Sequence, residues 1–363
     1  MLYQPFRVHG GLPVHVSPST ENPDERDPTL LCQWLGDHPV WVQDQLAKYG
    51  ALLFRGFDIH GPDDFEAVAR AIDDELKNHY LGTSPRNALT EYVFNASELP
   101  DYYPIPQHCE MTFCAHPPRR VFFCCLEEPR TGGGETPLCD FRKVWSELDP
   151  RVRERFLVGG LRIIRNYAGP AAGDQVLRTP DASSPSGPPT DPTQLKPWPD
   201  MFGTTDKAEV EAQCLAEGFE PIWLAGDALR LVSTQPVTID HPFTHQTVWY
   251  NHLTTFHVGT GLAEYTRIAK LRPTPRHQNM LRMAEGIDRL VRAKPPEERG
   301  MHVTYLDGSE ILEADIEAVR DAVWKHMSIT PWKQGDIIAI DNQSTAHGRL
   351  PYEGPRHIAV CWA

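Results

Sequence analysis

The sequence predicts a β-rich α+β fold in one domain with a long insertion, and three observations support this. Short strand-like runs, punctuated by proline and glycine, gather at about residues 102–140 and again at 335–362. Helical stripes and loop-like sequence fill most of the chain between them, at about residues 165–335. The 363 residues, of which 40% are hydrophobic, suffice for a substantial buried core. We therefore expect a single domain, residues 1–363, with an insertion between its two β-rich parts.

The first expected elements are a strand and a helix. Residues 51–57 form a short, mostly apolar run that is typical of a strand. In residues 63–78 the apolar side chains recur at helical spacing and form one stripe, which comprises Phe65, Val68, Ala69, Ile72 and Leu76. These patterns predict a strand followed by an amphipathic helix.

The first β-rich part, residues 102–140, consists of short runs separated by proline and by three successive glycines, and a helix is expected at 142–156. Residues 168–199 are crowded with Pro, Ser, Gly, Asp and Thr and hold too few apolar residues to become ordered by burial. We expect a long loop here, either mobile or a lid. Residues 206–217 then predict a short helix that stops at Gly218.

The rest of the chain alternates between helical and strand-like patterns. Residues 238–257 are strand-like and rich in aromatic side chains, and helices are expected at about 275–292 and 313–327. The last segment predicts one strand at 335–342 and a second at 357–362, joined by a turn at 348–355. This arrangement places His347 at the end of one strand and Arg356 at the start of the next.

Charge and cysteine usage limit the partners of the protein. The net charge of −14, from 35 Lys and Arg against 49 Asp and Glu, would repel a nucleic acid or an anionic membrane. The N-terminal residues lack the apolar core of a signal peptide, and no apolar run approaches a membrane span, so we expect a cytoplasmic protein. The eight cysteines contain no Cys-x-x-Cys pair and predict buried free thiols rather than disulfides or a structural zinc site.

A metal site is predicted from His108, Glu110 and the distant His347. In an extended strand, His108 and Glu110 share one face while Cys109 points to the other. With His347 they supply two imidazoles and one carboxylate, which is the ligand set that suits non-haem Fe(II) and leaves coordination positions open. Open positions indicate chemistry at the metal, and a keto acid and dioxygen could occupy them.

Arg356 and Thr136 are the candidate anchors for such a keto acid. An arginine fork matches the geometry of a carboxylate better than a lysine does, and a hydroxyl can complete the pairing. Arg356 lies close to His347 in the sequence, and Thr136 follows the strand that carries the first two ligands. The pattern therefore predicts a co-substrate site next to the metal.

Each of these residues also has a plain structural interpretation. A His-x-Glu tripeptide by itself is weak evidence, and a single histidine such as His347 is more often a hydrogen-bonded turn residue. Arg356 alone could be a surface cation, and Thr136 an ordinary β-branched strand residue. Asp341 and Asn342 could support the ligands or form a plain turn. Four further histidines are taken as structural or as supports of the ligands: His116, His241, His252 and His257.

Several stretches together carry a family resemblance. In chain order they are Leu52-Leu-Phe-Arg-Gly-Phe57, Gly82-Thr-Ser-Pro-Arg86, Pro104-Ile-Pro-Gln-His-Cys-Glu-Met111, Gly133-Gly-Glu-Thr-Pro-Leu138, Val248-Trp-Tyr-Asn251 and Asp341–Arg356. The sequence resembles the taurine dioxygenase (TauD/TfdA-like) family of Fe(II)- and 2-oxoglutarate-dependent oxygenases. Within it, the chain is most similar to the branch of syringomycin-type amino-acid hydroxylases and clavaminate synthase-like proteins.

The resemblance implies a double-stranded β-helix (jelly roll, cupin-like) core with flanking helices. It implies Fe(II) on His108, Glu110 and His347, with the distal carboxylate of 2-oxoglutarate on Arg356 and Thr136. Oxidative decarboxylation with O2 would yield succinate and CO2 and allow hydroxylation of an unactivated C–H bond. Family members that halogenate lack the carboxylate ligand, so the presence of Glu110 disfavours halogenation.

The sequence departs from the common family pattern at Cys109, where asparagine is frequent, and at His357, where a second basic residue is frequent. The loop at 168–199 is longer than in a minimal member, and we expect it to help cover the active site. Two substrate contacts are predicted. Arg349 would pair with a substrate carboxylate, with an internal salt bridge as the alternative, and Asn95 would face the pocket.

The leading function is hydroxylation of an amino acid or an amino-acid-derived small molecule, either free or tethered to a carrier protein. Desaturation, epoxidation or cyclisation on the same scaffold is the alternative, because only the fate of the substrate radical differs. A more remote alternative is a zinc-dependent hydrolase or a cupin-like binding protein. A hydrolase would not need Arg356 and Thr136.

Overall fold

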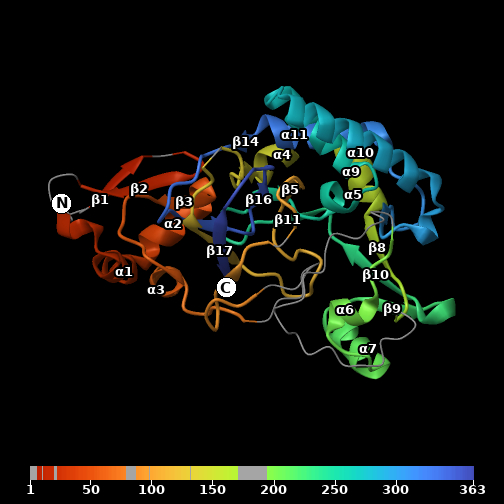
Figure 1. The fold of residues 1–363 in the computed structure, drawn as a ribbon, viewed down its shortest axis with the longest axis horizontal. Helices are drawn as coiled ribbons and strands as arrows, with labels where there is room; N and C mark the ends of the chain where they lie inside the picture. Colours follow the sequence, from red (N-terminus) through yellow and green to blue (C-terminus); the bar gives the residue numbers. More distant parts are fainter. Residues whose placement is uncertain are drawn as a thin grey trace.

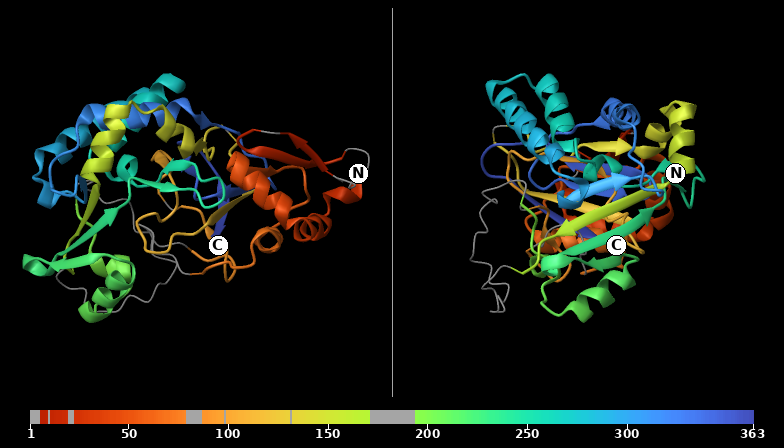
Figure 2. Two further views of the ribbon diagram at one scale, coloured as in Figure 1. Left: turned by 180° about the vertical axis from the view of Figure 1, so that it is seen from behind. Right: turned by 90° about the vertical axis from the view of Figure 1, so that its right-hand side faces the viewer.

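The computed structural model describes residues 6–9, 11–19, 23–78, 87–97, 99–130, 132–170 and 194–363. The motif at 82–86 and the greater part of the loop predicted at 168–199 lie outside these residues. The molecule is elongated (Figure 1). Its N-terminal helices lie at one end, and helices α6 (Trp198–Phe202) and α7 (Lys207–Ala216) lie at the other, as the view from behind also shows (Figure 2).

The larger sheet at the centre has seven strands within the described residues, in the order β1-β2-β3-β15-β6-β17-β4. All neighbouring strands are antiparallel except β2 and β3. The strands are β1 (Phe6–His9), β2 (Val14–Pro18), β3 (Ala51–Phe54), β4 (Phe94–Asn95), β6 (Arg120–Glu127), β15 (Ile337–Asp341) and β17 (His357–Trp362).

The two faces of this sheet bury alternate residues of the same strands. In β15, Ile338 and Ile340 join the core on one face, whereas Ile337 and Ala339 join a second core on the other. Helices cover the second face: α1 (Pro28–Asp37), α2 (Pro39–Tyr49) and α3 (Pro62–Ile72), with the short 3-10 turn η1 (Pro23–Arg26). Because both faces are covered, the strands read as continuous apolar runs in the sequence.

A smaller sheet with the order β14-β7-β16-β5 packs on the first face. The ring of Phe123 in β6 lies 4.9 Å from the ring of His347 in β16, so the two sheets meet at this point. The strands are β5 (Ile105–His108), β7 (Leu138–Asp140), β14 (Met327–Ser328) and β16 (Thr345–Arg349). The two facing, largely antiparallel sheets confirm the expected jelly roll, and the smaller one carries both histidines of the predicted metal site.

A third sheet, β13-β8-β10-β9, and a two-stranded ribbon of β11 and β12 come from the middle of the chain. The strands are β8 (Leu161–Tyr167), β9 (Glu220–Trp223), β10 (Leu229–Gln235), β11 (Thr238–Asp240), β12 (Thr247–Trp249) and β13 (Met301–Thr304). The accompanying helices are α8 (Leu253–Phe256), α9 (Thr260–Leu271), α10 (Pro275–Ala293) and α11 (Glu313–Lys325), with η2 (Ala225–Asp227) and η3 (Pro296–Glu298). The assignment of residues 1–363 to one domain with an insertion stays a prediction.

Three elements expected before residue 258 differ from the structure. The single helix expected at 142–156 is two helices, α4 (Phe141–Glu147) and α5 (Pro150–Gly159), because Asp149 caps the second helix and Pro150 begins it. The helix expected to reach residue 78 ends at Ile72. Residues 238–257 include the short helix α8 besides strands β11 and β12.

The C-terminal segment holds three strands rather than two. Strands β15 and β17 both pair with β6 in the large sheet, and the unexpected strand β16 between them crosses to the small sheet. His347 therefore lies in the middle of β16, not at a strand end. None of the described helices is long and apolar enough to cross a membrane, and all eight cysteines are free, six of them buried.

Candidate active site

His108, Glu110 and His347 lie together, although His347 is more than 230 positions from the other two in the sequence. Strand β16 pairs with β5 so that His347 stands opposite His108. The potential ligand atoms of the three residues all lie within 4.8 Å of one another. The expectation that His108 and Glu110 share one strand face was wrong, because β5 ends at His108 and Glu110 lies in the turn that follows.

The hydrogen bonds of this cluster orient its donor atoms. His108 Nδ1 lies 2.8 Å from the carbonyl oxygen of Pro106, and because a carbonyl only accepts, Nδ1 carries the proton and Nε2 the lone pair. His347 Nε2 lies 3.5 Å from Glu110 Oε2, and Glu110 and His347 are each 4% exposed. Two imidazoles and one carboxylate in this arrangement fit a divalent cation such as Fe(II).

Asn342 holds the turn that carries Glu110. The backbone N–H of Glu110 donates to Asn342 Oδ1 over 2.6 Å, and Asn342 Nδ2 donates to the carbonyl oxygens of Glu110 and Pro118. Asp341 instead accepts from His241 Nε2 at 2.8 Å and from Ser344 Oγ at 2.5 Å. The sequence left open whether Asp341 and Asn342 support a ligand or form a plain turn. Asn342 supports a ligand, because its side chain fixes the Glu110 backbone.

His252 lies beside the cluster. The sequence had left open whether it is structural or supports a ligand. Its ring centroid is 5.6 Å from that of His108 and 4.8 Å from that of Phe113. Thr112 Oγ1 lies 2.6 Å from His252 Nδ1, and burial lowers the pKa of His252 well below its ordinary value. His252 follows the motif that ends at Asn251 directly, and that position is the only signal in the sequence that could have indicated it.

Arg356 and Thr136 lie on neighbouring segments that lead into β17 and β7. Arg356 Nε donates to the carbonyl oxygen of Gly134 at 2.7 Å, and a Cβ at Gly134 would come within 2.8 Å of the Arg356 side chain. Thr136 Oγ1 accepts from Trp332 Nε1 at 3.2 Å. Burial and the nearby Arg349 lower the pKa of Arg356 to about 10. A desolvated arginine with a hydroxyl-bearing segment beside it suits a carboxylate.

Both residues predicted to contact the substrate form hydrogen bonds with protein groups. Arg349 is 3% exposed, and its two terminal nitrogens donate to the backbone carbonyls of Leu99, Pro100 and Tyr103. Asn95 Oδ1 lies 2.8 Å from His357 Nε2. Among the described residues Arg349 forms no salt bridge, so that alternative is not seen, while its contact with a substrate stays a prediction. Arg349 fixes the segment that enters β5.

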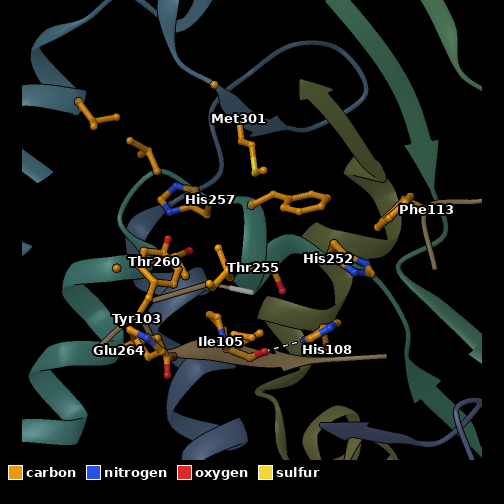
Figure 3. A pocket seen from close by; sticks show the side chains of 18 of the residues that line it. Tyr103, Ile105, His108, Phe113, His252, Thr255, His257, Thr260, Glu264 and Met301 are labelled. Atoms are coloured by element: carbon orange, nitrogen blue, oxygen red, sulfur yellow. Dashed lines mark hydrogen bonds between the residues drawn. The ribbon is translucent and has the colours of Figure 1, made fainter. Parts of the chain in front are cut away.

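A cavity of about 390 Å³ opens beside His108 and Glu110 (Figure 3). Phe113 and His252 lie near His108 in this view, whereas His257, Thr260 and Glu264 group on the opposite side. The remaining lining residues are Leu99, Tyr103, Pro104, Ile105, Pro106, Thr255, Phe256, Val258, Gly261, Val291, Gly300 and Met301. Cavities of this size and mixed character hold small molecules.

Comparison with known proteins covers nearly the whole chain. The family model described as "Taurine catabolism dioxygenase TauD, TfdA family" matches residues 15–362. Dapdiamide synthesis protein DdaC of Enterobacter agglomerans is 28% identical over 328 residues, which are 90% of this chain and 85% of that protein. A clavaminate synthase-like protein of Arabidopsis thaliana is 28% identical over 333 residues, 91% of this chain and 86% of that protein.

A solved structure agrees at the level of the fold. The crystal structure of the PvcB protein from Pseudomonas aeruginosa superposes with a TM-score of 0.50 at 13% sequence identity, over 100% of this chain and 92% of that one. At this identity the likeness concerns the fold alone.

Proposed function

The chain belongs to the TauD, TfdA family of dioxygenases, and from this premise we propose that it hydroxylates an unactivated C–H bond of an amino acid or an amino-acid-derived metabolite. Family membership makes it a 2-oxoglutarate-dependent non-haem iron dioxygenase that uses Fe(II), 2-oxoglutarate and O2. This replaces the alternatives of a zinc hydrolase and a binding protein.

The observation that carries the proposal is the convergence of His108, Glu110 and His347 within 4.8 Å. These three residues would hold the iron, which supplies the oxidation of 2-oxoglutarate and of the substrate C–H bond. The Pro106 carbonyl keeps the His108 ring oriented, and Asn342 keeps the Glu110 turn in place. Glu110 occupies the carboxylate position, which favours hydroxylation over halogenation.

Arg356 and Thr136 would bind the distal carboxylate of 2-oxoglutarate. Arg356 Nε donates to Gly134, and with no other hydrogen-bond or ion-pair partner for this side chain in the described part of the chain, its two terminal nitrogens can form the fork that a carboxylate accepts. The Thr136 hydroxyl accepts from Trp332 and can donate its own proton to a carboxylate oxygen. Burial strengthens these charge-assisted hydrogen bonds, because water competes less for the guanidinium.

The substrate class is supported by the relatives and by the cavity. One relative is named for dapdiamide synthesis and another for its likeness to clavaminate synthase. The cavity beside the proposed iron ligands has the size of a small-molecule site. We propose a small-molecule substrate, either free or tethered to a carrier protein, with desaturation, epoxidation or cyclisation as the alternative outcome.

The cofactor site is tested by anaerobic titration of the metal-free protein with Fe(II) and 2-oxoglutarate, followed by the visible charge-transfer band of the chelated keto acid. We expect a band in wild type, loss of the band in His347→Ala, and a band that needs far more 2-oxoglutarate in Arg356→Ala. His241→Ala, which changes a buried histidine outside the cluster, should keep the band. A band that persists in His347→Ala would refute the proposed ligand set.

The reaction and the form of the substrate are tested by succinate release and mass spectrometry. Free amino acids are compared with the same aminoacyl groups as carrier-protein thioesters. A gain of one oxygen indicates hydroxylation, whereas a loss of two hydrogens indicates desaturation or ring closure. Succinate release that no amino acid or aminoacyl derivative stimulates would contradict the substrate class.

A further inference from the structure

Glu264 is a buried carboxylate that lines the cavity on the side away from His108 (Figure 3). It lies in α9 and is 8% exposed. One of its oxygens, Oε1, accepts a hydrogen bond from Trp324 Nε1 over 3.2 Å. The other oxygen, Oε2, has no hydrogen-bond or ion-pair partner among the described residues. A carboxylate oxygen in such a place is costly unless a ligand or water satisfies it.

The positive charges near Glu264 are paired with other carboxylates. Arg267 donates to Glu317 at 2.8 Å and to Asp321 at 2.5 Å, and Arg320 also bonds Glu317. Burial raises the pKa of the Glu264 carboxyl group. The charges of Arg267 and Arg320 lower this pKa without a direct hydrogen bond, and their effect is smaller than that of burial. Glu264 thus has room for a cationic partner that the protein itself does not provide.

The lining of the cavity favours a cation. Among the described residues it contains two carboxylates, Glu110 and Glu264, and no lysine or arginine. His257, which groups with Glu264 in Figure 3, does not add a positive charge, because burial and the nearby Arg320 lower its pKa to about 3. Phe256 adds an aromatic ring, which can attract a cation, whereas the Phe113 ring already has the Arg165 guanidinium 5.0 Å from its centroid.

His257 and Thr260 also define what Glu264 can bind. His257 Nδ1 accepts from the backbone N–H of Gly259 at 3.3 Å, so in the neutral ring Nε2 carries the proton. The Thr260 hydroxyl donates to the carbonyl oxygen of Thr254 at 2.9 Å. His257 therefore offers a donor at Nε2, and the Thr260 hydroxyl hydrogen is already bonded to Thr254. Of His257, Thr260 and Glu264, only Glu264 is a charged acceptor.

We propose that Glu264 binds a primary ammonium group of the substrate and so holds the substrate across the cavity, with its reacting carbon toward His108 and His347. The proposal rests on the function proposed above, because it takes this cavity as the substrate site. It makes Glu264 a residue that determines specificity for amines. The substrate class is accordingly narrowed to molecules that keep a free amino group remote from the carbon that is oxidised.

Calorimetry on the anaerobic Fe(II)- and 2-oxoglutarate-loaded enzyme at pH 7, below the usual pKa of an α-amino group, tests this proposal with two probes. L-Norleucine amide carries an ammonium group, and hexanamide is its counterpart without the amine. We expect wild type to bind the aminoamide about tenfold or more tightly than hexanamide, as a desolvated ion pair allows. In Glu264→Gln, which keeps the shape and an acceptor for Trp324, this preference should fall to about twofold or less.

Glu317→Gln is the matched control, since it makes the same chemical change in a carboxylate that pairs with Arg267 and Arg320 outside the cavity lining. It should keep the preference for the amine. If Glu264→Gln does not fold, Glu264→Asp replaces it and should weaken the aminoamide selectively. Equal binding of both probes to wild type, no measurable binding of either, or an unchanged preference in the Glu264 variant would overturn the proposal.

The charge-transfer band, recorded on the same samples, separates this proposal from the proposed function. A normal band without amine preference refutes only the role of Glu264. A missing band with intact amine preference refutes the iron and 2-oxoglutarate residues and leaves Glu264 as an ammonium site.

Discussion

At the scale of single residues, the site depends on polar side chains that hold its ligands in place. Asn342 is fully buried and makes three hydrogen bonds to the backbone, two of them to Glu110. Asn342 would affect metal affinity only indirectly, through the position of Glu110. Groups that orient ligands are commonly worth one to two orders of magnitude in metal affinity.

Replacing Asn342 with Ala should therefore weaken Fe(II) binding by about 10- to 100-fold. It should also lower the free energy of unfolding by about 2–4 kcal/mol, because buried backbone groups lose their partners. Fe(II) titration and denaturant unfolding measure the two effects. Gln343→Ala, in the adjacent and less buried position, is the control and should change neither. Unaltered Fe(II) affinity in Asn342→Ala would show that Glu110 holds its position without this clamp.

His257 predicts a pH dependence of stability. Its pKa is lowered from 6.5 to about 3 in the folded protein, mainly by burial. Above pH 6.5 the ring is neutral in both states and contributes no pH dependence. As the pH falls below 6.5, only the unfolded chain takes up the proton, so stability is lost progressively down to about pH 3.

For His257→Gln, which cannot titrate, the drop in unfolding free energy between pH 7 and pH 4.5 should be smaller than in wild type by about 2–3 kcal/mol. Urea unfolding at the two pH values measures this difference. His116→Gln, for which no such burial applies, is the control and should follow wild type. Parallel losses in wild type and His257→Gln would mean that His257 is protonated in the folded state.

At the scale of elements, the pairing of β16 with β5 brings the two histidines together. Gly348 lies between His347 and Arg349, where the register of this pairing shifts. A Cβ at Gly348 would lie 2.5 Å from the carbonyl oxygen of Ile105 and 2.8 Å from Gln107 Nε2. Backbone atoms cannot yield as a flexible side chain does, so the two strands need glycine here.

Gly348→Ala should push β16 away from β5, lower the unfolding free energy by about 1–3 kcal/mol and weaken Fe(II) binding. The two quantities are measured by thermal unfolding and by metal titration. Gly286→Ala is the matched control, because a Cβ at Gly286 in α10 meets nothing within 4 Å. It should stabilise the helix slightly. If Gly348→Ala binds Fe(II) as wild type does, the close approach is not what sets the distance between the histidines.

At the scale of the whole molecule, the site joins parts of the chain that lie far apart. Glu110 belongs to the first β-rich part, whereas His347 and Asn342 belong to the last. The third sheet and its helices are inserted between these parts in sequence, and they contribute the cavity wall that carries His257 and Glu264. A metal bound here would connect both ends of the fold.

Fe(II) together with 2-oxoglutarate should therefore stabilise the protein. A ligand that binds only the folded state, at a free concentration about 100 times its Kd, raises the free energy of unfolding by about 2.7 kcal/mol. We expect EDTA to lower the Tm of the loaded protein, and readdition of Fe(II) under anaerobic conditions to restore it. His347→Ala should show little response to either treatment. A Tm that ignores EDTA in wild type, at a metal concentration that produces the charge-transfer band, would contradict this linkage.

The sequence by itself determined the chemistry and the family. Ligand type depends on the side chain alone, so His108, Glu110, His347, Arg356 and Thr136 could be selected from motifs and spacing. The apolar runs of the central strands and the helical stripes predicted several elements, because burial imposes a period that is visible locally. Other elements, such as α1, α2 and α9, were not predicted. Errors arose where a cap and a proline divided a helix, and where β16 left the large sheet for the small one.

Only the tertiary structure decided which residues surround the ligands. The register of β16 against β5 set the approach of His347 to His108, and that register depends on contacts between strands more than 230 residues apart. The sequence left the roles of Asn342 and His252 open and offered no sign of Glu264, because a hydrogen bond or a shared cavity wall depends on partners distant in the chain. Arg349, selected as a substrate contact, binds three carbonyls that only the folded chain brings to it, and no motif announced those bonds.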